Sequence, residues 1–119
     1  MKQEIEKFIN DQLSIWPEAA AKYRALKNVQ TREVIVNGLA VTLQHNPDRI
    51  KSAVANVDAA SIRQRPCFLC EQNRPKVQHH ITFEGRKGKN YFVTVNPYPI
   101  FLNHLVISRD KHMPQSIWH

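Results

Sequence analysis

Apolar residues near the N-terminus recur at spacings of three and four. These residues are Ile5, Phe8, Ile9, Leu13 and Trp16. The spacing places them on one face of a helix from about residue 2 to residue 15. Pro17 suits the first turn of a new helix, and good helix formers follow it. We therefore predict a helical element within residues 1–30 whose role is packing.

The pattern changes to alternation, with more β-branched residues, from Glu33 onward. Asn37-Gly38 separates the runs 33–36 and 39–43. Asn-Gly between two such runs is a strong hairpin signal, because both turn positions need a positive φ. A polar connection and an Ala-rich stretch follow to about Ile62, and they predict a loop with a short helix.

Later apolar runs predict three further strands. The runs 81–84 and 91–95 form a second β pair around a turn, and 105–107 supplies another strand. Residues 113–119 resemble the first turn of a helix. The sequence thus predicts a single α+β domain over residues 1–119, with N-terminal helices and an antiparallel sheet.

Composition narrows the class of protein. The chain has 119 residues, 42% of them hydrophobic, which excludes intrinsic disorder for most of its length. No apolar run approaches the ~18 residues of a membrane span, and acidic residues stand where a signal peptide would be basic. We expect a cytoplasmic protein without a membrane partner.

The net charge of +7 suits an anionic ligand such as a nucleotide. The basic residues are spread along the chain, which disfavours nucleic acid.

The chain has two cysteines, Cys67 and Cys70, in a Cys-x-x-Cys pair. Two thiolates at this spacing can bind one metal ion from a tight turn, and zinc is the usual occupant. A redox role is disfavoured, because the pair neither follows a buried strand nor opens a strong helix. In a third interpretation, the two residues are plain reduced cysteines on a turn. Histidines would have to complete a metal site, and the candidates are His79, His80, His104, His112 and His119.

The segment from Asn96 to Phe101 contains two prolines, Pro97 and Pro99, in an apolar stretch. Prolines do not fit the middle of a paired strand, so they predict a rigid, half-exposed wall between strands. Such a wall suits a flat aromatic ligand. Arginine offers paired donors for phosphate, although each arginine could equally be a surface charge. The candidates for phosphate contact are Arg49, Arg65 and Arg109.

The order of these motifs resembles the histidine-triad superfamily. The Cys-x-x-Cys pair precedes a hairpin, Asn96 stands eight positions before His104, and His112 follows eight positions later. The Asn-x-x-Pro form is most similar to a branch of nucleotidyltransferases and phosphorylases. That branch includes galactose-1-phosphate uridylyltransferase, diadenosine tetraphosphate phosphorylase and the plant GDP-galactose phosphorylase. The resemblance covers residues 66–115 well and residues 33–65 more weakly.

The resemblance implies a function and a set of site residues. The function is nucleotidyl transfer or phosphorolysis of a nucleoside diphosphate sugar or a dinucleoside polyphosphate, through a nucleotidyl-histidine. Asn96 would bind the ribose hydroxyls, unless it only caps the turn before Pro97. The base pocket would be lined by Pro99, Ile100 and Phe101, and Arg49 would complete the nucleotide site.

The resemblance also implies a zinc site. Cys67, Cys70 and His112 stand where zinc-bearing members place three ligands, and the fourth is not assigned. His104 corresponds to a histidine that is buried and hydrogen-bonded, not a ligand. His79 and His80 remain the competing ligands.

One departure from the superfamily concerns catalysis. Its nucleophile lies in a His-x-His-x-His or His-x-His-x-Gln run, and these 119 residues contain no such run. We predict no catalytic residue in the chain and no activity from it alone. We expect residues 33–119 to be the N-terminal part of a longer histidine-triad-like domain. An uncovered sheet edge should then favour a homo-oligomer.

An alternative function belongs to another class. The chain would be a small zinc-stabilised module whose basic face binds nucleic acid or an acidic partner. It would need a complete tetrahedron, such as Cys67, Cys70, His112 and either His79 or His80. A structural domain without a ligand is the third interpretation.

Overall fold

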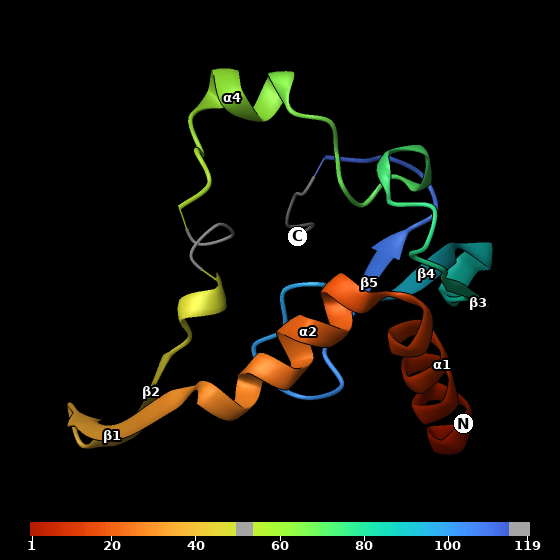
Figure 1. The fold of residues 1–119 in the computed structure, drawn as a ribbon. Coiled ribbons are helices and arrows are strands. Elements are labelled where there is room, and N and C mark those ends of the chain that lie inside the picture. The colour runs from red at the N-terminus through yellow and green to blue at the C-terminus, as the bar shows by residue number, and fades with distance from the viewer. Residues whose placement is uncertain (50–53, 115–119) are drawn as a thin grey trace.

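The computed structural model describes residues 1–49 and 54–114 (Figure 1). N-terminal helices precede two antiparallel sheets, which confirms the predicted α+β class. Helix α1 spans Lys2–Ile15 and helix α2 spans Pro17–Ala25, and Trp16 between them has a non-helical backbone (φ −125°, ψ 83°). Among the described helices, none is long and apolar enough to cross a membrane.

The first sheet is an isolated two-stranded hairpin. Strand β1 (Gln30–Val36) follows the short 3-10 helix η1 (Leu26–Asn28) and pairs with β2 (Leu39–His45). Asn37 and Gly38 have φ values of 50° and 79°, as the Asn-Gly signal predicts for a turn whose two central residues both need a positive φ. Figure 1 shows this hairpin extending away from the other sheet.

The second sheet has three strands in the order β3-β4-β5, all antiparallel. Its strands are β3 (Ile81–Glu84), β4 (Asn90–Val95) and β5 (Leu105–Arg109). All three were expected from the apolar runs. Since β3 and β5 have no outer partner among the described strands, both present an edge. A homo-oligomer formed through such an edge stays a prediction.

Short helices connect the two sheets. The Ala-rich stretch contains helix α4 (Ala59–Gln64), which confirms the predicted short helix there. Asp58 caps it, because its Oδ1 accepts from the backbone N–H groups of Ala60 and Ser61. The 3-10 helices η2 (Pro47–Arg49) and η3 (Glu71–Asn73) also lie in this connection, whereas η4 (Arg86–Gly88) lies between β3 and β4. The helical turn expected over residues 113–119 lies mostly outside the described residues.

The core lies where α1 and α2 pack on β4. Ile9, Tyr23 and Val95 are its buried centre, and partly buried apolar residues surround them: Ile5, Phe8, Leu13, Leu26 and Leu105. The apolar face predicted for α1 therefore has the packing role expected of it. The radius of gyration is 16.7 Å, compared with about 13–14 Å for a compact chain of this length. The hairpin and α4 project from a small core.

Tyr23 ties α2 to the loop between β4 and β5. Its hydroxyl lies 3.1 Å from the Asn96 carbonyl oxygen and 3.0 Å from the His104 carbonyl oxygen. The Asn96 N–H also donates to the His104 carbonyl over 2.9 Å, so these residues close the loop. Burial raises the pKa of Tyr23 to about 12. A helix residue thus holds both ends of the loop that contains the predicted wall.

We expect Tyr23→Phe to lower the free energy of unfolding by about 1–2 kcal/mol at pH 7, because one hydroxyl serves two carbonyls in partly buried bonds. The folded state raises this pKa, so the stabilisation is present below pH 10 and is lost as the pH rises through about 12. Urea unfolding at pH 7 and pH 11 measures both effects. The control is Tyr98→Phe at a more exposed tyrosine. Equal stability of wild type and Tyr23→Phe at pH 7 would contradict the prediction.

Candidate functional site

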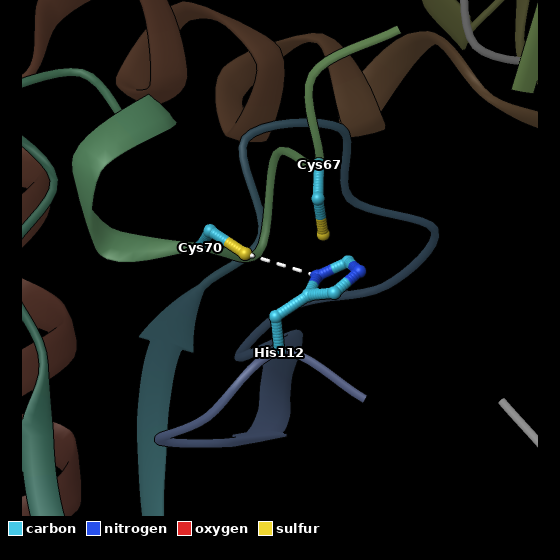
Figure 2. A group of neighbouring side chains, drawn as sticks. All are labelled: Cys67, Cys70 and His112. Atoms are coloured by element: carbon cyan, nitrogen blue, oxygen red, sulfur yellow. Dashed lines mark hydrogen bonds between the residues drawn. The ribbon is translucent and has the colours of Figure 1, made fainter. Parts of the chain in front are cut away.

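Cys67, Cys70 and His112 come together at the surface (Figure 2). One ligand atom from each lies within 4.8 Å of the others. The Cys70 Sγ is 3.2 Å from the His112 Nδ1. These are the three residues predicted as metal ligands, and the tertiary structure joins them across 42 positions of sequence. The group could hold a metal ion.

The loop that carries the two cysteines is a series of tight turns. The Cys70 N–H donates to the Cys67 carbonyl oxygen over 3.2 Å, which closes the Cys-x-x-Cys turn. Asn73 then bonds twice to the same turn, through its side chain to the Cys67 carbonyl (2.9 Å) and through its N–H to the Cys70 carbonyl (3.0 Å). The pair follows α4 and precedes a 3-10 turn, so it has no buried strand before it. This setting lacks the features of a thioredoxin-like motif.

His112 reaches the cysteines from the other side, beyond the end of β5. The Asp110 N–H donates to the Asn90 carbonyl over 3.2 Å, which continues the β4-β5 pairing past Arg109. His112 follows two residues later and is exposed. The sheet therefore positions the histidine, and the loop positions the sulfurs.

The two thiols differ in acidity. Burial opposes ionisation of Cys67, but backbone N–H groups of Leu69 and Cys70 lower its pKa overall. Burial and the neighbouring Cys67 raise the pKa of Cys70, and Arg74 partly offsets this. Two sulfurs and one imidazole nitrogen fit a metal that prefers thiolate and imidazole ligands. In the described part of the chain no fourth His, Cys, Asp or Glu joins the group.

The other candidate histidines have different surroundings. His80 lies against Phe92, with ring centroids 4.1 Å apart, and its Nδ1 is 3.2 Å from Arg74 Nη2. His79 is exposed and lies outside the group. His104 is partly buried, and its ring accepts a hydrogen bond from the Ile100 N–H. His119 lies outside the described residues.

Asn96 caps the turn that follows it. Its Oδ1 accepts from the Tyr98 N–H over 2.8 Å, so the turn-capping role is present. This bond fixes which end of the amide is oxygen, and it directs the Nδ2 group toward His104 Nε2, 3.4 Å away. A ribose contact through Nδ2 stays a prediction.

His104 presents a second donor beside Asn96. Its Nδ1 accepts from the Ile100 N–H over 3.2 Å, so in the neutral ring the proton is on Nε2. Burial and the positive charge of Arg49 lower the pKa of His104, which keeps the ring neutral at pH 7. The His104 Nε2–H and the Asn96 Nδ2–H groups are then both donors, so they cannot hydrogen-bond to each other. An oxygen acceptor placed between them would bond to both.

The predicted base wall is only partly accessible. Pro99 is fully buried, so its ring supports the wall from behind. Ile100 and Phe101 line an open depression of about 290 Å³. The rest of its lining comes from Leu26, Val29, Thr31, Gln44 and Leu102. Phe101 stacks on His104 with ring centroids 4.5 Å apart and is 57% exposed. An aromatic face therefore lies beside the two donors.

The three candidate arginines are not equivalent. Arg49 is partly buried and close enough to His104 to lower its pKa, and its Nε has no acceptor among the described residues. Arg65 is exposed. Arg109 lies over the ring of Tyr91, 5.6 Å from its centroid, and its Nε is 3.7 Å from Asp110. Of the three, Arg49 is the one beside the wall.

Three buried polar residues, Gln12, Arg74 and Thr94, were not among the candidates from the sequence. Gln12 is 2% exposed and bonds through its side chain to Val77 and His79. Gln12 falls within the apolar stripe of α1, three positions after Ile9, so its position in the sequence could have predicted its burial. Arg74 is 9% exposed. Nothing in the local sequence distinguishes it from the exposed arginines.

Comparison with known families places this α+β chain in one of them. A model described as a domain of unknown function, DUF4922, matches residues 8–119, and the chain belongs to that family. Neither a curated protein nor a solved structure shows significant similarity to the chain.

Proposed function

We propose that this chain binds the nucleotide in a reaction of nucleotidyl transfer or phosphorolysis. The substrate class is a nucleoside diphosphate sugar or a dinucleoside polyphosphate. The observation that carries the proposal is the pair of donors on Asn96 and His104 next to the exposed ring of Phe101. The motif order shared with the histidine-triad superfamily supports it, and we propose that the DUF4922 family is related to that superfamily's nucleotidyltransferase branch.

The chemistry of a nucleotide matches this arrangement. A base can stack on the outer face of Phe101 and fill the depression lined by Ile100. A ribose hydroxyl can accept from the Asn96 amide and from His104 Nε2–H. Arg49 supplies the positive charge that a phosphate needs, and it is close enough to His104 to lower the pKa of that ring.

The proposal gives the residues of this chain a binding role only. Nucleotidyl transfer through a histidine needs a nucleophile in line with the α-phosphorus. The 119 residues contain no His-x-His-x-His or His-x-His-x-Gln run. His104 uses its Nδ1 to accept a backbone bond, so we assign it no nucleophilic role.

We also propose that the metal held by Cys67, Cys70 and His112 is zinc. Two thiolates and an imidazole are a frequent zinc donor set, and zinc needs no redox partner. Bound there, the ion would join the cysteine loop to the end of β5. This cross-link would stabilise a chain whose core is small, and no step of the reaction is assigned to it.

Nucleotide binding is tested by titrating ADP, GDP and UDP-glucose into isotope-labelled protein and following amide chemical shifts. We expect affinities on the order of 1 mM, with shifts at Asn96 and its neighbours. Phe101→Ala should weaken binding by roughly tenfold, because base stacking contributes about 1–3 kcal/mol. Phe83→Ala, at an exposed phenylalanine on β3 outside the depression, is the control. Shifts confined to the N-terminal helices would refute the proposal.

A zinc-stabilised binding module is the second candidate. The observation that favours it is that three ligands meet at the surface of a chain with net charge +7. This function predicts that the protein binds a single-stranded oligonucleotide or a polyacidic peptide with salt-dependent affinity, while nucleotides leave Asn96 unshifted. The same titrations distinguish the two functions.

A further inference from the structure

Arg74 is the one buried side chain in a long exposed segment. Between residues 54 and 92, every other described residue is at least partly exposed to solvent. Arg74 itself is 9% exposed, and its Nε and Nη1 have no hydrogen-bond acceptor among residues 1–49 and 54–114. A buried guanidinium without a carboxylate is costly, so its position needs another explanation.

The contacts of Arg74 join the cysteine loop to the sheet. Its guanidinium carbon lies 5.4 Å from the ring centroid of Phe92, and Nη2 lies 3.2 Å from His80 Nδ1. The distance to the ring is that of a cation–π contact. His80 packs on the same ring, so Arg74, His80 and Phe92 form one cluster.

On the loop side, backbone hydrogen bonds make Arg74 part of the cysteine turn. The Arg74 N–H donates to the Glu71 carbonyl over 3.2 Å. The residue before it, Asn73, bonds to the carbonyls of Cys67 and Cys70. A displacement of the Arg74 side chain therefore displaces the backbone that carries both sulfurs.

On the sheet side, Phe92 belongs to the same strand pair that positions His112. Phe92 on β4 pairs with Ser108 on β5, and the chain continues from there to His112. The Arg74–Phe92 contact thus spans the two halves of the metal site.

We propose that Arg74 is a positioning residue for the metal site: it docks the cysteine loop on Phe92 and so sets the distance between the sulfurs and His112. This inference rests on the proposal that these three residues bind zinc. Arg74 makes no hydrogen bond to a ligand atom of the site, since its side chain contacts His80 and Phe92, and it acts through the loop.

The test uses Co²⁺ as a spectroscopic substitute for zinc in the full chain. Arg74→Gln should weaken Co²⁺ and Zn²⁺ binding by about tenfold, in the range of other residues that orient metal ligands. At saturating Co²⁺ its visible ligand-field bands should also be weaker than those of wild type, because the sulfurs and the histidine no longer meet in one geometry. A purely structural role would change stability but not the spectrum of the saturated site.

Two further variants make the result decisive. Arg65→Gln removes the same charge from an exposed arginine two residues before Cys67, and it should leave affinity and spectrum unchanged. Arg74→Lys keeps the charge without the planar group and should bind with intermediate affinity, which covers the case in which Arg74→Gln does not fold.

Full recovery by Arg74→Lys, or equal losses from Arg65→Gln and Arg74→Gln, would replace positioning with a charge effect and overturn the inference. Wild-type affinity in Arg74→Gln overturns it while leaving the zinc site intact. Failure of the wild type to bind either ion overturns both.

Discussion

Cys70→Ser is expected to reduce zinc affinity by at least about 100-fold, because it removes one of three protein ligands from a site with no fourth ligand in the described chain. The thermal midpoint of the zinc-loaded protein should fall toward that of the metal-free protein. Equilibrium dialysis with metal analysis measures the affinity, and thermal unfolding with and without chelator measures the stability. Wild type prepared without chelator should contain close to one zinc per chain.

A matched pair of histidine substitutions tests the ligand assignment. His112→Ala should reduce zinc affinity about as strongly as Cys70→Ser, since His112 Nδ1 lies 3.2 Å from the Cys70 sulfur. His79→Ala removes an exposed histidine outside the group and should have no effect. The reverse result, with zinc lost in His79→Ala and kept in His112→Ala, would establish the competing ligand set.

Gln12→Ala is expected to lower the free energy of unfolding by roughly 3 kcal/mol. The Gln12 side chain donates to the Val77 carbonyl over 2.7 Å and accepts from the His79 N–H over 2.7 Å. Truncation leaves both backbone groups without their partner and opens a cavity beside α1, and each loss costs about 1–3 kcal/mol. For a chain of this size the thermal midpoint should fall by roughly 10 °C or more.

Amide hydrogen exchange locates the effect of this substitution. The His79 amide should lose protection in Gln12→Ala by more than amides of β4 do, because its acceptor is the missing side chain. Gln3→Ala, at an exposed position of the same helix, is the control and should leave stability within about 0.5 kcal/mol. An unchanged midpoint in Gln12→Ala would mean that water replaces the glutamine without cost.

Gln12 and Arg74 attach neighbouring parts of one segment to the rest of the protein. Gln12 holds residues 77–79 against α1, and Arg74 holds the cysteine loop against Phe92. Between them, the chain from Cys67 to β3 is attached to the rest of the protein by polar side chains instead of an apolar core. A metal ion held by the two cysteines and His112 would add a third attachment. This explains why a chain with so small a core would gain from a zinc cross-link.

The sequence by itself determined the elements whose signals are local. The 3-4 spacing on α1, the Pro at the start of α2 and the Asn-Gly turn at residues 37–38 each depend on neighbours within a few positions. Such patterns act through backbone geometry and amphipathic burial, and no distant contact is needed to read them. The candidate metal ligands also came from the sequence, but through a resemblance that associated His112 with the cysteines.

Only the tertiary structure decided which side chains share a site and in what state. It placed Pro99 behind the wall and left Phe101 exposed, although both belong to one apolar stretch. It used the Asn96 oxygen for a turn and set the proton of His104 on Nε2 through a bond from Ile100. It buried Arg74 while leaving Arg65 in solvent. These outcomes depend on packing between segments far apart in the chain, because burial and hydrogen-bond partners are properties of the assembled fold and not of local residue order.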